Sequence, residues 1–112
     1  MKVNELINRL NLTLFNGEEG MNNEVTDGYT SDLLSNVMGN ADEGMVWITM
    51  QTHQNVVAVA TLKDIAAVII VNGHKPEEDM LQKSREEGIP ILGTTLSAFE
   101  ISGKIYQLLH KE

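Results

Sequence analysis

The sequence predicts an α/β fold with a mainly parallel central sheet of about four to five strands flanked by helices. Two segments, residues 45–50 and 66–71, are almost continuously apolar or β-branched, as strands covered on both faces are. From residue 45 onward, strand-like and helix-like segments alternate. Such alternation is typical of parallel strands joined by right-handed helical crossovers.

The first quarter of the chain predicts a helix followed by a strand. Apolar residues recur at helical spacing over residues 2–10, and residues 12–15 alternate toward a strand that ends at Asn16-Gly17. Residues 16–24 are polar and rich in Gly and Asn, which indicates a surface connection inside one domain. The direction in which the first two strands join the sheet stays open.

The middle of the chain predicts two helices around the first aliphatic strand. Thr30 or Ser31 is expected to cap a helix that ends at Gly39-Asn40 or Gly44. The apolar face of this helix would consist of Leu33, Leu34, Val37 and Met38. Residues 56–64 have helical spacing although they are rich in β-branched side chains. Between these helices, Trp47 is expected in the core.

The last third of the chain predicts two helices with a strand between them. Pro76 suits the first position of a helix that ends at Gly88. A strand over residues 89–92 follows, and Ser97 with Glu100 has the spacing of a capping box that opens a final helix. The residues of this helix expected to face a core are Phe99, Ile101, Ile105 and Leu108 or Leu109.

Length, charge and cysteine content limit the classes of function. A chain of 112 residues is the usual size of one domain, so residues 1–112 are expected to share one core. The net charge of -8 disfavours nucleic acid and anionic lipid as partners. The absence of cysteine excludes disulfides, thiol nucleophiles and iron–sulfur ligation, and we expect no cofactor. Without a signal-peptide core or an apolar run near the ~20 residues of a membrane span, we expect a cytoplasmic protein.

The loops that follow the predicted strands are the expected place for a ligand. In an open parallel sheet, ligands bind beyond the carboxyl ends of the strands. The polar loops at residues 27–32, 51–55, 72–75 and 93–97 suit a small polar or anionic ligand. Helix capping and turns are the competing explanation for Thr30, Ser31, Thr95 and Ser97 and for the glycines of these loops.

Individual titratable residues give no catalytic or metal-binding pattern. His53 follows a buried strand and would bind an anion, contact a carbonyl or act as a pH-sensitive group. Asp32 is expected to complement a helix N-terminus, and His110 is expected to face solvent. No third ligand accompanies the histidines at a metal-binding spacing, and the glycines fit neither a P-loop nor a dinucleotide fingerprint.

Four segments resemble the DRTGG domain in their order and spacing, particularly its small stand-alone members. They are Tyr29–Met38, Trp47–Ala60, Ile69–Gly73 and Glu87–Leu92. The resemblance covers about residues 2–110, and its most specific part is the stretch from Trp47 to Ala60. It implies a fold related to the N-terminal domain of HPr kinase, a homodimer and a regulatory accessory role. It also implies a redox- or hydrogenase-linked setting, with a redox-protein or histidine-kinase-type ATPase partner.

The chain departs from the motifs that name the family. It has Gln51-Thr52-His53 near the D-R-T position and Val71-Asn72-Gly73 near the T-G-G position, so only Gly73 is retained. The T-x-x-T-H-x-N pattern of the stand-alone subgroup is present. The resemblance therefore gives the site candidates Thr49, Thr52, His53 and Asn55, and the neighbouring loops add Asn72, Gly73, Thr94 and Thr95.

Three functions compete at this point. The first is a non-catalytic regulatory module that binds a ligand around His53. The second is a structural or assembly adaptor for a redox complex. The third is a small hydrolase or transferase that uses His53 with Asp27 or Asp32, for which the sequence offers no recognisable nucleophile.

Overall fold

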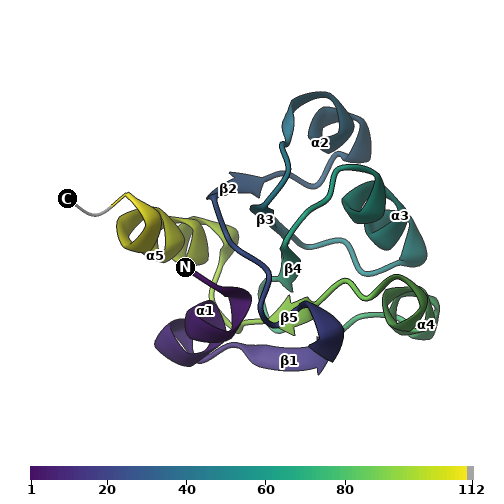
Figure 1. Cartoon of the computed structure of the whole chain (residues 1–112), viewed down its shortest axis with the longest axis horizontal. Coiled ribbons are helices and arrows are strands. Elements are labelled where there is room, and N and C mark those ends of the chain that lie inside the picture. The colour runs from purple at the N-terminus through teal and green to yellow at the C-terminus, as the bar shows by residue number, and fades with distance from the viewer. Residues whose placement is uncertain (111–112) are drawn as a thin grey trace.

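The two aliphatic segments form adjacent central strands in the computed structural model, which describes residues 1–110. These strands are β3 (Met45–Thr49) and β4 (Ala67–Ile70), and they pair in parallel. β2 (Asp27–Thr30) and β5 (Ile91–Gly93) extend the parallel sheet on either side, whereas β1 (Thr13–Asn16) pairs with β5 in the antiparallel direction. The strand order is β1-β5-β4-β3-β2 (Figure 1), and the predicted α/β class is confirmed.

Helices cover both faces of this sheet (Figure 1). α1 (Val3–Leu10) and α5 (Ala98–Leu109) pack on one face. α2 (Leu34–Asn40), α3 (Gln54–Leu62) and α4 (Glu78–Glu87) pack on the other. A short 3-10 turn, η1 (Glu18–Gly20), lies in the connection between β1 and β2.

Successive side chains of the central strands point to opposite faces of the sheet and contribute to two hydrophobic cores. Val46 and Ile48 of β3 point toward α1 and α5, while Trp47 belongs to the core under α2, α3 and α4. Trp47 is fully buried, as predicted, and its indole N–H donates to the carbonyl of Ser31 at 2.8 Å. Each fully buried large aliphatic side chain contributes about 1.5–3 kcal/mol, so strands buried on both faces require continuously apolar sequence.

Several helix ends agree with the predicted signals. Gly88 ends α4 in the left-handed conformation, with φ 69°. Ser97 caps α5, accepting the backbone N–H of Glu100 at 3.2 Å, and the Glu100 carboxylate accepts in return from the Ser97 backbone N–H at 3.4 Å.

The predicted starts of α2 and α4 are wrong. The N-cap of α2 is Leu33, because the Ser31 hydroxyl accepts the Leu33 backbone N–H at 3.1 Å in a local turn before the helix. The Thr30 hydroxyl instead lies 2.7 Å from that of Ser102 on α5. Pro76 precedes α4, whose N-cap is Glu77.

Three side chains predicted to face a core are exposed instead. Leu33 is the N-cap of α2 and Met38 lies within it, and this helix of 7 residues buries only Val37. Phe99 lies in the first turn of α5, on the side away from the sheet, and is 89% exposed. His110 is exposed, as predicted, and its Nε2 lies 2.9 Å from Oδ1 of Asp27 on β2.

None of the helices within residues 1–110 combines the length and the apolar character that a membrane span requires.

Candidate functional site

The four parallel strands end at the same edge of the sheet, and a polar loop follows each of them (Figure 1). These loops begin after Thr30, Thr49, Ile70 and Gly93. All of the predicted site residues lie at or just beyond this carboxyl edge. They fall into two groups, one around the loop after β3 and one around the loops after β4 and β5.

Thr49 ends β3 and is only 1% exposed. Its hydroxyl donates to Asp32 Oδ1 at 2.9 Å and accepts the backbone N–H of Gln51 at 3.2 Å. The same oxygen of Asp32 accepts the backbone N–H of Met50 at 2.8 Å. Asp32 therefore fixes the start of the loop after β3, and the expectation that it complements a helix N-terminus is wrong.

Thr52, His53 and Asn55 lead from this loop into α3. The Thr52 hydroxyl donates to the Glu77 carboxylate at 3.1 Å, and the Glu77 backbone N–H donates to the Thr52 carbonyl at 2.8 Å. This pair of bonds ties the loop after β3 to the loop after β4. His53 is the half-buried N-cap residue of α3 and makes no side-chain capping bond, while Asn55 is exposed in the first turn.

Asn72 and Gly73 form the tip of a tight turn after β4. Both have left-handed backbones, with φ 60° and 70°, and the backbone N–H of His74 closes the turn on the carbonyl of Val71 at 3.2 Å. Asn and Gly tolerate this conformation better than other residues do, which explains the Asn-Gly pair without reference to a ligand.

The loops after β4 and β5 are joined to each other. The backbone N–H of Gly73 donates to the carbonyl of Thr94 at 2.9 Å, and that of Asn72 donates to the carbonyl of Leu96 at 2.9 Å. The Thr94 hydroxyl accepts the Leu96 backbone N–H at 3.2 Å, and Thr95 is exposed at the tip of its loop. The second group of candidates is therefore brought together by main-chain bonds.

A groove of about 640 Å³ opens beside this second group. Gly73, Thr94 and Thr95 line one side of it together with His74 and Lys75. Residues at the end of α1 and in β1 line the other side: Leu10, Asn11, Thr13 and Phe15. Thr49, Thr52, His53 and Asn55 are not among the lining residues.

Sequence reasoning missed the contribution of α1 and β1 to this groove. It depends on β1 being placed next to β5 at the edge of the sheet, which no local pattern indicated. Gly93 is required at that junction, because a Cβ there would lie 2.4 Å from Phe15 Cε2. Phe15 thus packs directly against the backbone at the end of β5.

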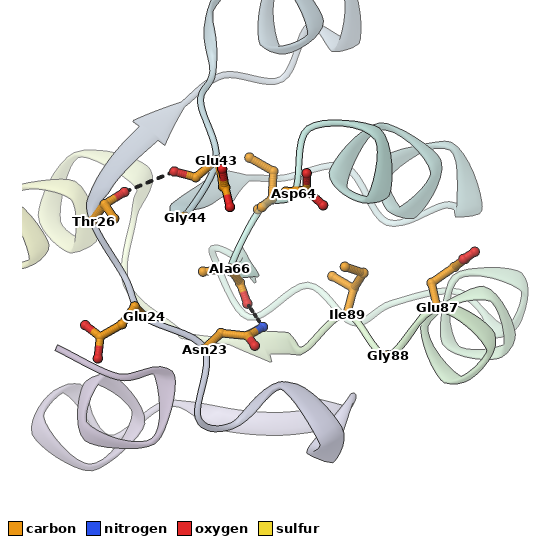
Figure 2. Close-up of a pocket in the computed structure, with 11 residues that line it drawn as sticks. Asn23, Glu24, Thr26, Glu43, Gly44, Asp64, Ala66, Glu87, Gly88 and Ile89 are labelled. Atoms are coloured by element: carbon orange, nitrogen blue, oxygen red, sulfur yellow. Dashed lines mark hydrogen bonds between the residues drawn. The ribbon is translucent and has the colours of Figure 1, made fainter.

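A second large cavity lies at the opposite edge, where the parallel strands begin (Figure 2). It measures about 660 Å³, and its lining includes four carboxylates, those of Glu24, Glu43, Asp64 and Glu87. Its lining contains no Lys, Arg or His. The groove at the carboxyl edge has the opposite character, since its lining contains Lys75 and His74 and no carboxylate. Anions are therefore favoured at the carboxyl edge and disfavoured at the other.

The described residues show no assembled catalytic or metal-binding cluster. Asp27 is bonded to His110 and Asp32 to Thr49, and within residues 1–110 neither carboxylate hydrogen-bonds to His53. No three His, Asp or Glu side chains in this part of the chain lie close enough to hold a metal ion.

Comparison with known proteins identifies one family and one related fold. The family model of the DRTGG domain matches residues 5–108. A solved structure of the CBS and DRTGG domains of the regulatory region of Clostridium perfringens pyrophosphatase, complexed with its activator diadenosine tetraphosphate, is similar with a TM-score of 0.69 at 13% identity. The similarity covers 95% of this chain and 46% of that chain, so this chain spans about half the length of its structural relative. A search of curated proteins gives no match.

Proposed function

Because the chain belongs to the DRTGG domain family, we propose that it is a regulatory module without catalysis of its own. In this proposal, it binds a small polar or anionic ligand over the carboxyl edge of its sheet. The groove between the loops after β4 and β5 and the end of α1 is the principal binding surface. The loop that carries Thr52, His53 and Asn55 forms a second contact surface along the same edge.

The observation that carries the proposal is the contrast in charge between the cavities at the two edges of the sheet. In a chain of net charge -8, the groove at the carboxyl edge has a lysine and a histidine in its lining and no acid. The remaining lining is mixed: hydroxyls of Thr94 and Thr95 stand beside the apolar surfaces of Phe15 and Leu10. Ligand sites commonly combine an apolar lining with a few convergent polar groups, and this groove does so.

The hydrogen bonds between loops support a regulatory role. The loops after β3 and β4 are joined through Thr52 and Glu77, and those after β4 and β5 through Asn72 and Leu96. A ligand seated on one loop therefore contacts a connected set of loops. The binding free energy of the ligand would favour the conformation of these loops that the ligand binds best, including any conformation that also binds a partner.

Nucleotides are the first ligands to test. The regulatory region with the similar fold is complexed with a dinucleoside tetraphosphate activator, which is a polyanion with aromatic bases. A base would suit the apolar side of the groove, and phosphates would suit Lys75. At 13% identity this ligand is a starting point for a screen, which should also include phosphorylated metabolites and redox cofactors.

The test is a melting-temperature screen of the parent with Lys75→Ala, His53→Ala and Lys63→Ala. Lys63 is the matched control because it ends α3 at the opposite edge of the sheet. A ligand at 100 times its Kd adds about 2.7 kcal/mol of stability, equivalent to a rise of roughly 10 °C in a domain of this size. We expect such a rise in the parent and in Lys63→Ala, and its loss in Lys75→Ala.

Other outcomes separate the alternatives. Loss of the rise in His53→Ala alone would move the ligand to the loop after β3. Absence of any rise across the panel would contradict the ligand-binding proposal and favour the adaptor function, which the exposed apolar side chains Leu33, Met50 and Leu62 support independently. In that case, complex formation with a partner should survive His53→Ala.

The cellular setting is the remaining part of the proposal. We propose a cytoplasmic homodimer that acts as an accessory to a redox- or hydrogenase-linked signalling system, with a redox protein or a histidine-kinase-type ATPase as partner. This part depends on the family resemblance alone. Affinity capture from native cytosol with the parent as bait, followed by identification of the retained proteins, tests it.

A further inference from the structure

The outer side of α5 carries two large side chains that stay mostly exposed, although the ring of Tyr106 stacks on that of His110 with centroids 4.2 Å apart. Phe99 is 89% exposed and Tyr106 is 64% exposed, and they lie about two turns apart along the same side of the helix. Between them, Gly103 faces outward, and a Cβ built on it would have no atom within 4 Å. An exposed aromatic pair beside an open glycine is unusual on the free surface of a soluble domain.

Charged side chains line the other side of Gly103. Helical geometry places Glu100 and Lys104 there, about one turn apart, opposite the side that carries Phe99 and Tyr106. We call Phe99 and Tyr106 the aromatic flank, and Glu100 and Lys104 the charged flank. Ile101 and Ile105 are buried on the sheet side, so α5 cannot turn either flank inward without losing its core contacts.

We infer that these two flanks form the surface on which a second copy of this chain docks, with the two α5 helices antiparallel and Gly103 at their crossing. This inference rests on the homodimer proposed above and is independent of the ligand. It assigns a surface to that dimer, which neither the resemblance nor the sequence pattern did.

The spacing of the aromatic flank is self-complementary. Along the helix, Phe99 lies about 6 Å before Gly103 and Tyr106 about 4.5 Å after it, at 1.5 Å per residue. A two-fold axis near Gly103 therefore places Phe99 of one copy opposite Tyr106 of the other, twice. Gly103 has no side chain to hold the helices apart at the crossing, so the aromatic rings can meet.

The charges select the antiparallel arrangement. In a two-fold antiparallel pair, each flank faces the same flank of the other copy, so Glu100 faces Lys104 at nearly the same axis position. A parallel two-fold pair would instead place the charged flank of each copy against the aromatic flank of the other, so Glu100 and Lys104 would not meet. The antiparallel pair is also closed, which limits assembly to two copies.

The size of the surface predicts a modest affinity. α5 has 12 residues and is about 18 Å long, so its outer side buries less than the ~800 Å² per partner of a standard interface. We therefore expect a dimer that dissociates on dilution in the micromolar range. Sedimentation velocity across a concentration series measures this directly.

The first experiment compares dimer dissociation constants. Phe99→Glu is expected to weaken the dimer at least about tenfold, as loss of a central aromatic contact does. Leu62→Glu is the matched control, because Leu62 is 70% exposed on α3 and away from the proposed surface. Lys104→Glu should also weaken the dimer, and adding Glu100→Gln should restore part of the affinity, because Gln keeps the capping box while removing the repulsion.

The second experiment uses the absence of cysteine in the chain. Gly103→Cys should be joined to its copy by a bismaleimide that spans the about 8–10 Å between packed helices. Gly39→Cys on α2 is the control, since Gly39 is equally open around its Cβ and should not be joined.

Two results would overturn the inference. A parent that stays monomeric at high micromolar concentration contradicts the dimer itself. A dimer that persists in Phe99→Glu, without cross-linking through Gly103→Cys, contradicts the surface. The ligand screen is read as melting temperature and does not depend on either result, so failure here and failure of the ligand proposal are distinguishable.

Discussion

The Oδ1 atom of Asp32 accepts the hydroxyl hydrogen of Thr49 at 2.9 Å, which joins the loop after β2 to the buried end of β3. The same oxygen accepts the backbone N–H of Met50 at 2.8 Å. Thr49 is one of only two buried polar residues among the described residues, the other being Ser84. A buried hydroxyl needs a partner, so the carboxylate and the threonine form one structural unit at the carboxyl edge.

Replacement of Asp32 by Ala should therefore destabilise the fold. The Thr49 hydroxyl and the Met50 N–H lose their acceptor, and an unsatisfied buried donor costs about 1–3 kcal/mol. Thr49→Val should cost less, because the exposed carboxylate of Asp32 keeps its bond to Met50 and can bind water, and only the Gln51 backbone N–H loses its acceptor. Urea denaturation measures both, with Asp42→Ala, an exposed carboxylate at the opposite edge, as control. Equal losses in Asp32→Ala and Asp42→Ala would contradict the role of Asp32 as acceptor for Thr49 and Met50.

Gly93 and Phe15 should behave as a coupled pair. In Gly93→Ala, the new methyl group would lie 2.4 Å from Phe15 Cε2, so the ring must move, and overpacking of this kind costs about 1–3 kcal/mol. Phe15→Leu removes the atoms that collide. A double-mutant cycle should therefore show that Gly93→Ala costs less in the Phe15→Leu background than in the parent. Additive losses would show that Phe15 does not occupy the space above Gly93.

Substitutions of Gly73 distinguish a requirement for the left-handed backbone from a role in ligand binding. Its φ of 70° strains any residue with a Cβ, although no atom would lie within 4 Å of that Cβ. Gly73→Val should cost about 1–2 kcal/mol through the left-handed backbone alone, whereas Gly73→Asn should cost less. If Gly73→Asn keeps its melting temperature but loses a ligand response that the parent has, the glycine serves the ligand as well as the turn.

The central part of the fold was predictable because strands buried on both faces have continuously apolar sequences. β3 and β4 need apolar side chains on both faces, and Gly88 and the Ser97–Glu100 pair are local signals that end or begin a helix. The start of α2 was not predictable from capping preferences, because Ser31 uses its hydroxyl in a turn two residues before the helix.

The site was predictable only where it depends on the parallel strands. The carboxyl edge follows from the alternation of strands and helices, and Gly73, Thr94 and Thr95 were found in that way. The role of Phe15 and Leu10 depends on β1 lying antiparallel to β5, a long-range pairing that residues 12–15 do not encode locally. Likewise, the helical spacing that predicted Phe99 in a core cannot distinguish a face buried within the domain from an apolar face that stays exposed.

The pair of His110 and Asp27 predicts a small acid-dependent loss of stability. A hydrogen bond from His110, 2.9 Å away, and then one from the backbone N–H of Gly28 lower the pKa of Asp27 from its ordinary 3.8. Because the folded pKa is the lower one, this stabilisation is fully present above about pH 3.8 and is lost as the pH falls through the folded value.

Both side chains are about 40% exposed, so the stabilisation from this pair should be at most about 1 kcal/mol. The unfolding free energies of the parent and Asp27→Asn should therefore differ at pH 5 and converge as the pH falls through the lowered folded pKa of Asp27, where its carboxylate becomes protonated in both states. Asp42→Asn is the control, and a difference between parent and Asp27→Asn that stays constant from pH 5 to the acid limit would contradict the contribution of the charged carboxylate.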